Sequence, residues 1–149
     1  MDQIRITKEF NFEMAHALMG YDGPCRNIHG HSYTLKVTIT GRPLTDTTDP
    51  KLGMVMDFGD LKKIVRRTVV NVFDHALVLN EAMKGSLSEQ LNAQFGNVIY
   101  TPYQPTSELM VIDFAGRISR ELPEGLKLFS VMLRETATSY AEWFASDNA

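Results

Sequence analysis

The chain has 149 residues, of which 44% are hydrophobic, and its formal net charge is −3 at pH 7. This length predicts a single domain, residues 1–149, with enough apolar side chains for a core. The acidic balance lacks the basic face of a nucleic-acid-binding protein, so we expect no nucleic-acid partner. No apolar run approaches the roughly 18 residues of a membrane-spanning helix, and the N-terminus lacks a signal-peptide pattern. We therefore expect a cytoplasmic protein with no membrane contact.

Two strands are predicted in the first 40 residues. The first covers residues 4–12 and continues to His16, and the second covers residues 32–40, where apolar and polar residues alternate with a period of two. His29 and His31 lead directly into the second strand, so their side chains point to the same side of it. If the two strands pair, His16 comes to lie beside them.

These three histidines predict a metal site. Four of the five histidine and cysteine residues in the chain lie between positions 16 and 31. Three neutral imidazoles with a free fourth position are typical of catalytic zinc, whereas a structural zinc site normally has four protein ligands. The alternative, an ordinary polar role, is the more common one for any single histidine. The clustering of three favours the metal site.

Cys25 is the only cysteine, so an intrachain disulfide is excluded. A lone cysteine is often a small buried apolar residue, and that is the alternative here. Cys25, however, follows a turn-rich segment and lies four residues before His29. A metal ion nearby would favour the thiolate over the thiol. We therefore predict a reactive base or nucleophile at this position.

The middle of the chain predicts a short strand over residues 53–57 and an amphipathic helix over residues 60–73. Asp74 and His75 follow the helix directly. A carboxylate next to an imidazole fixes its tautomer and stabilises its charged form, so this pair suits proton transfer. The alternative is a histidine that only complements the dipole at the helix C-terminus.

Segment 80–104 is long for an unstructured connection, and we predict a small helix within it. Ser86 and Glu89 have the spacing of a capping box at the start of that helix. A second amphipathic helix is predicted to follow, with Thr106 as its N-cap and its last apolar residue at Leu122.

The C-terminal part predicts two strands, over residues 126–135 and 140–145. Glu135 ends the first of them. It is either an exposed strand end, which could pair with Arg134, or a planar acceptor for two donors of a ligand. The order of all elements predicts an α+β fold, with an antiparallel sheet and two helices packed on one face.

The motifs of the chain, taken together, resemble one known family. The matching residues are Phe10-x-Phe12 with His16, Cys25-x-x-x-His29-Gly-His31, Met56-Asp57-Phe58-x-x-Leu61-Lys62, Asp74-His75 with Leu79-Asn80, Pro105-Thr106-Ser107-Glu108, and Arg134-Glu135-Thr136. They resemble the 6-pyruvoyl-tetrahydropterin synthase and 6-carboxytetrahydropterin synthase family. The three-residue gap between Cys25 and His29 is similar to that of the bacterial carboxytetrahydropterin branch, which feeds queuosine biosynthesis.

The resemblance implies a site and a reaction. Zn²⁺ would be held by His16, His29 and His31; the catalytic residues would be Cys25, Asp74, His75 and Glu135; and the substrate pocket would include Glu135, Thr106 and Glu108. The implied activity is a zinc-dependent lyase that converts 7,8-dihydroneopterin triphosphate to 6-carboxy-5,6,7,8-tetrahydropterin with release of acetaldehyde and triphosphate. Two alternatives remain, a 6-pyruvoyl-tetrahydropterin synthase and a non-catalytic zinc-containing pterin-binding protein.

The resemblance also implies an architecture. Members of this family have the tunnelling fold, in which several subunits, commonly six, close their sheets into a barrel with active sites at the subunit interfaces. We therefore expect a homo-oligomer, a hexamer by this resemblance, although no pattern in the sequence itself indicates an interface.

Overall fold

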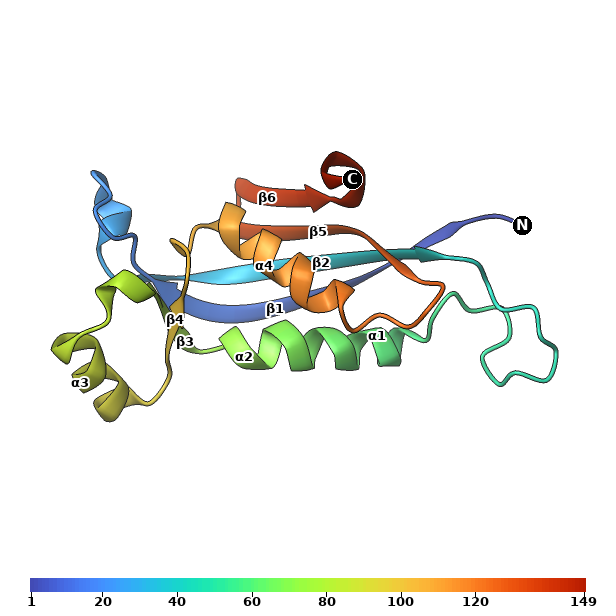
Figure 1. The fold of residues 1–149 in the computed structure, drawn as a ribbon, viewed down its shortest axis with the longest axis horizontal. Helices are drawn as coiled ribbons and strands as arrows, with labels where there is room; N and C mark the ends of the chain where they lie inside the picture. Colours follow the sequence, from blue (N-terminus) through green and yellow to red (C-terminus); the bar gives the residue numbers. More distant parts are fainter.

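The protein folds around one six-stranded sheet with helices on one face, as shown by a computed structural model that describes all residues, 1–149 (Figure 1). The order of the strands across the sheet is β4-β3-β1-β2-β5-β6. The strands are β1 (Ile4–His16), β2 (His29–Gly41), β3 (Ala76–Asn80), β4 (Val98–Thr101), β5 (Lys127–Thr136) and β6 (Ser139–Phe144). The helices are α1 (Phe58–Val65), α2 (Asn71–Phe73), α3 (Ser86–Phe95) and α4 (Ser107–Ser119).

Strands β1 and β2 form the centre of the sheet and pair antiparallel over their whole length, from Ile4 opposite Gly41 to His16 opposite His29. Their alternation places one set of apolar residues on the face that α1, α2 and α4 cover (Figure 1). On this face Phe12 stacks on Tyr33 with ring centroids 5.2 Å apart. The core therefore lies between the helices and a single face of the sheet.

The sheet is mixed, which corrects the antiparallel sheet expected from the sequence. β3 pairs parallel with the last three residues of β1, and β4 pairs parallel with β3. Neither short strand was predicted, because runs of four or five residues give little periodicity and parallel partners lie far apart in the sequence. The predicted strand over residues 53–57 is wrong. Leu44 instead pairs with Gly53 and Met54 in a local turn, and Gly53 adopts a positive φ of 83°.

The predicted helices are confirmed, with different boundaries. The helix expected over residues 60–73 begins at Phe58 and continues through a π-helical turn, Arg66–Val70, to Phe73. The helix that follows Thr106 is confirmed with that residue as its N-cap, and it ends at Ser119. The small helix is α3, but its N-cap is Gly85 and not Ser86. The Ser88 hydroxyl, and not Glu89, bonds to the Gly85 backbone.

The uncovered face of the sheet is polar along its central strands. The Thr7 hydroxyl bonds to that of Thr38, and the Ser32 hydroxyl donates to Glu13. None of the helices has the length and apolar character needed to span a bilayer.

Candidate active site

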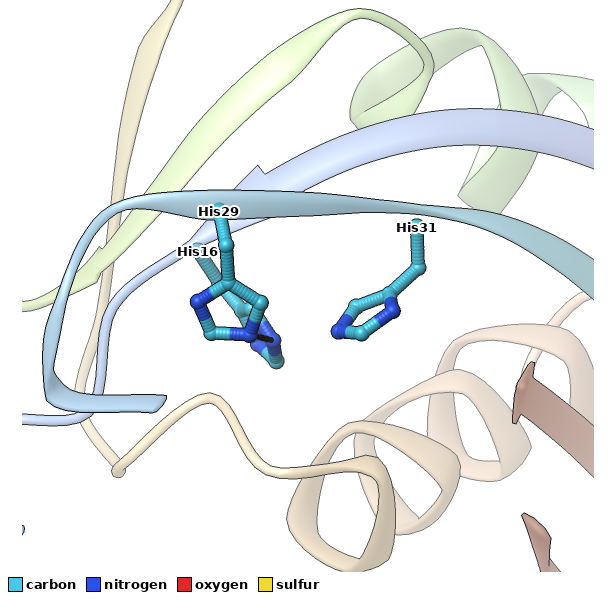
Figure 2. A group of neighbouring side chains, drawn as sticks. All are labelled: His16, His29 and His31. Carbon is cyan, nitrogen blue, oxygen red and sulfur yellow. Dashed lines mark hydrogen bonds between the residues drawn. The ribbon is translucent and has the colours of Figure 1, made fainter. Parts of the chain in front are cut away.

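Three histidines converge at the end of the sheet where β1 stops and β2 begins. His16 and His29 are direct partners in the β1–β2 register, and His31 lies two residues further along β2 on the same face. Figure 2 shows the three rings turned toward one common space. Each ring offers one nitrogen, and these nitrogens lie within 4.8 Å of one another, so the group could hold a metal ion. The shared face predicted from the alternation of β2 is confirmed.

The hydrogen bonds of the histidine rings leave the nitrogens that face one another without protons. The Nδ1 atoms of His16 and His29 donate to the carbonyl oxygens of Pro105 and Asn27, each at 2.7 Å, because a carbonyl can only accept. In the neutral rings both Nε2 atoms then carry lone pairs, and they are 3.0 Å apart. The buried Nε2 of His31 has no hydrogen-bond partner. Two lone pairs and one unpartnered ring nitrogen, all facing one space, are a suitable set of ligands for a cation.

The electrostatics of the site favour neutral imidazoles, which is the form that binds metals. Burial lowers the pKa of His16, whose side chain is almost fully enclosed, and this effect outweighs the opposing hydrogen bond to Pro105 and the charge of Glu135. Burial also lowers the pKa of His31. Protonation of a ring is therefore an unfavourable way to relieve the repulsion between the close Nε2 atoms, and binding of a divalent ion is a more favourable one.

Glu135 faces the same space from β5. One of its carboxylate oxygens lies 3.4 Å from Nε2 of His16 and 3.5 Å from Nε2 of His31. Arg134 turns away, donates to the Ala137 carbonyl and lies over the Tyr140 ring. Of the two alternatives left open by the sequence, the structure thus excludes the simple surface pair of Glu135 with Arg134.

Tyr33 of β2 lies close to Glu135 of β5. Burial, and then the negative charge of Glu135, raise the pKa of the Tyr33 phenol, so it stays protonated. Its hydroxyl is buried without a geometric hydrogen-bond partner. No sequence motif marks Tyr33 as a site residue, although it shares the face of His31 through the same alternation.

A small pocket of about 100 Å³ adjoins Glu135. Its lining residues come from the start of α4 and from the two C-terminal strands: Ser107, Glu108, Glu135, Ser139, Tyr140 and Ala141. The buried hydroxyl of Ser107 has no partner. Thr106, expected in this wall, instead caps α4 by accepting from the Leu109 backbone N–H, and it is absent from the lining. Ser107 was missed because it neighbours a residue whose capping role was evident.

Cys25 lies in the connection between β1 and β2, in a short 3-10 turn, Pro24–Arg26. It is half-buried and its thiol is free. Its sulfur is not part of the group formed by the three histidines. Cys25 is therefore close to His29 in the sequence, but it is not one of the potential metal ligands.

Asp74 and His75 form the predicted pair, with His75 Nδ1 3.0 Å from Asp74 Oδ1. The Glu13 N–H donates to the same carboxylate, and this bond, followed by the His75 interactions, holds the pKa of Asp74 below its usual value. His75 is the one non-glycine residue with a positive φ, 61°, and its own N–H donates to the Glu13 carbonyl. Such a strained conformation is typical of functional positions.

His75 lies on the opposite face of the sheet from the three histidines. It lines a groove with Ala15 and Leu77, which alternate along their strands with the buried residues Met14 and Val78. Its side chain is 78% exposed. Within one chain the sheet therefore separates the Asp74–His75 pair from the three imidazoles.

Comparison with known proteins identifies the family. Residues 5–146 match the family model described as 6-pyruvoyl tetrahydropterin synthase. The chain belongs to this family. A relative from Haemophilus influenzae named 6-carboxy-5,6,7,8-tetrahydropterin synthase is 37% identical over 93% of this chain and 97% of its own length. One from Rickettsia bellii with the same name is 32% identical over 93% of this chain and 99% of its own.

The solved structure of Caenorhabditis elegans 6-pyruvoyl tetrahydropterin synthase is similar in fold, with a TM-score of 0.67 and 24% identity over 97% of each chain. The tunnelling fold expected from the sequence is thereby confirmed for the single chain. The chain is thus a member of the 6-pyruvoyl tetrahydropterin synthase family. Of the predicted site residues, its fold brings together His16, His29, His31, Glu135 and Glu108. Asp74 and His75 lie apart from this group.

Proposed function

We propose that this protein is a 6-carboxy-5,6,7,8-tetrahydropterin synthase, a zinc-dependent lyase acting on 7,8-dihydroneopterin triphosphate in queuosine biosynthesis. The names of the relatives support this choice of product, and so does the short gap between Cys25 and His29. The observation that carries the proposal is the convergence of three imidazole nitrogens beside the Glu135 carboxylate.

The metal in this proposal is Zn²⁺, held by His16, His29 and His31. The residues fit it because the three ring nitrogens lie within 4.8 Å of one another, and because the carbonyls of Pro105 and Asn27 orient two of the rings. When bound, the ion would polarise the side-chain oxygens of the substrate as a Lewis acid.

The pterin ring is proposed to bind at Glu135. A carboxylate matches the flat pair formed by a ring N–H and the neighbouring amino group, and it accepts both hydrogens. The free hydroxyl of Ser107 and the Glu108 side chain complete the near wall of this pocket. The Tyr33 phenol, kept protonated by its surroundings, lies close to the Glu135 carboxylate.

Proton transfer is assigned to Cys25 and to the Asp74–His75 pair. The Cys25 sulfur, as a thiolate, would take a proton from the substrate side chain, and His75 would act as the partner acid or base. Asp74 remains ionised and accepts from the imidazole, so it fixes the His75 tautomer.

Because His75 faces away from the three histidines of its own chain, we propose that it acts in the site of a neighbouring copy within a homo-oligomer, a hexamer by family resemblance. The exposed apolar surface beside His75 supports this. Ile28 is 58% exposed there and Phe95 of α3 is 79% exposed. The pocket at Glu135 is also smaller than the roughly 300 Å³ at which ligand sites usually begin, as expected if a second chain completes it.

One incubation tests the proposed reaction. Zinc-loaded protein is mixed with 7,8-dihydroneopterin triphosphate, and every product is identified by mass spectrometry. Acetaldehyde formed together with triphosphate and 6-carboxytetrahydropterin supports the proposal. Triphosphate release without acetaldehyde would show the pyruvoyl-type reaction instead, and binding without consumption of the substrate would show a pterin-binding protein.

A further inference from the structure

The side-chain amide of Gln104 forms a pair of hydrogen bonds with the backbone of Met19, one as donor and one as acceptor. Its Nε2 donates to the Met19 carbonyl at 2.8 Å, and its Oε1 accepts from the Met19 N–H at 3.2 Å. Asn80, at the end of β3, donates to the same oxygen at 3.3 Å. These three partners also fix which end of the amide is oxygen and which is nitrogen.

Met19 belongs to the connection between β1 and β2, residues 17–28, which also carries Cys25. Within this loop the Leu18 N–H donates to the Cys25 carbonyl at 3.0 Å. Two links thus join the Gln104 side chain to the backbone of Cys25, through Met19 and its neighbour Leu18.

Few other interactions hold this loop. From Met19 to Ile28 most residues are exposed, so apolar packing contributes little. The remaining hydrogen bonds of the loop join its residues to one another or to His29 at the start of β2, as in Arg26 to Gly23 and Asn27 to Pro24. The two hydrogen bonds between Gln104 and Met19 therefore join the loop to the segment that precedes α4.

On its other side Gln104 is continuous with the substrate pocket. Pro105, the next residue, accepts from His16 Nδ1, and Ser107 and Glu108 line the pocket at Glu135. A displacement of the backbone at residue 104 would therefore shift the Cys25 loop, one potential metal ligand and the pocket wall.

We propose that Gln104 is a positioning residue, which holds the Cys25 loop in register with the metal ligands and the pterin pocket. This rests on the proposed function, because Cys25 is the base in that reaction. Gln104 is not one of the three potential metal ligands and does not line the pocket at Glu135.

The test compares Gln104→Ala with Gln3→Ala, a control at the exposed start of the chain. Gln104→Ala removes the two hydrogen bonds that hold the base but keeps the backbone that joins residue 104 to Pro105 and the pocket wall. We therefore expect kcat to fall about 10-fold to 100-fold, with KM and zinc content unchanged. Gln104→Glu keeps the acceptor oxygen and loses the donor to Met19, so its kcat should lie between those of wild type and Gln104→Ala. Equal kcat in all variants would overturn the proposal.

A second measurement needs no substrate. Cys25 is the only cysteine, so the rate of alkylation by iodoacetamide reports its loop alone. A released loop exposes the half-buried thiol, and we expect labelling several-fold faster in Gln104→Ala and unchanged in Gln3→Ala. A lower melting temperature with unchanged labelling would show a purely structural role. If wild type fails to turn over the substrate, the proposed function fails, while the labelling result still decides whether Gln104 positions the loop.

Discussion

His16 and His29 face each other across the last register pair of β1 and the first of β2, with their Nε2 atoms 3.0 Å apart. Both Nδ1 atoms donate to backbone carbonyls, so both Nε2 atoms present lone pairs. This arrangement is unfavourable without a cation and favourable with one. The backbone carbonyls of Pro105 and Asn27 thus orient two of the three rings in a group that could hold a metal ion.

Removing one of these rings should remove the metal. We expect His29→Ala to lose bound zinc, because two imidazoles and a distant carboxylate make a weak site. The measurement is metal content by mass spectrometry of protein purified in the presence of zinc. His75→Ala is the matched control and should keep its zinc, since its ring lies on the other face of the sheet. Full zinc content in His29→Ala would refute the ligand assignment.

The metal-free protein should lose stability as the pH falls below about 6.5, the ordinary histidine value. Burial lowers the pKa of His16 and of His31 in the folded state. The unfolded chain then binds more protons than the folded one in the range below 6.5, so protonation favours unfolding there. Above that range both states are neutral and the contribution is fully present.

Thermal melts of metal-free protein between about pH 7.5 and 5.5 check this dependence. The midpoint should fall with pH in wild type, and it should fall less in His16→Gln. Gln3→Ala, at the exposed start of the chain, carries no titratable change and should behave as wild type. A midpoint that rises as the pH falls would contradict the direction of both pKa shifts.

The local features of this fold were readable from the sequence, and the non-local ones were not. The alternation after His31 fixed the face of the histidines, and the Thr106 hydroxyl marked the start of α4, because both depend on neighbouring residues only. The parallel strand β3 escaped detection, and with it the direction of His75. That side chain is placed on the far face by pairing with a strand some 60 residues earlier, which no local pattern encodes.

Glu135→Gln tests the pterin pocket. The amide keeps the shape of the carboxylate but replaces one acceptor oxygen with a donor and removes the charge. Losing a charge-assisted hydrogen bond to the ligand predicts about a 10-fold to 100-fold fall in kcat/KM. Steady-state kinetics with 7,8-dihydroneopterin triphosphate measure it, and Glu108→Gln, which is exposed at the pocket rim, should have a smaller effect. An unchanged kcat/KM in Glu135→Gln would remove this residue from the binding site.

Mixed oligomers test whether His75 acts in a neighbouring subunit. Cys25→Ala and His75→Ala should each lose catalysis by about 100-fold or more, as expected for the loss of an acid or base. If each site combines Cys25 of one copy with His75 of another, random one-to-one mixing restores both groups in about a quarter of the sites. Activity of the co-expressed, co-purified mixture measures this recovery.

The control for that experiment mixes Cys25→Ala with the double variant Cys25→Ala/His75→Ala, in which no site can regain a cysteine. It should stay as inactive as its parents. Mixed oligomers that form, as native mass spectrometry would show, and yet remain inactive would contradict an intersubunit role for His75. The Asp74–His75 pair would then be left with its structural role, in which Asp74 and the strained His75 backbone together pin the start of β3 to Glu13 of β1.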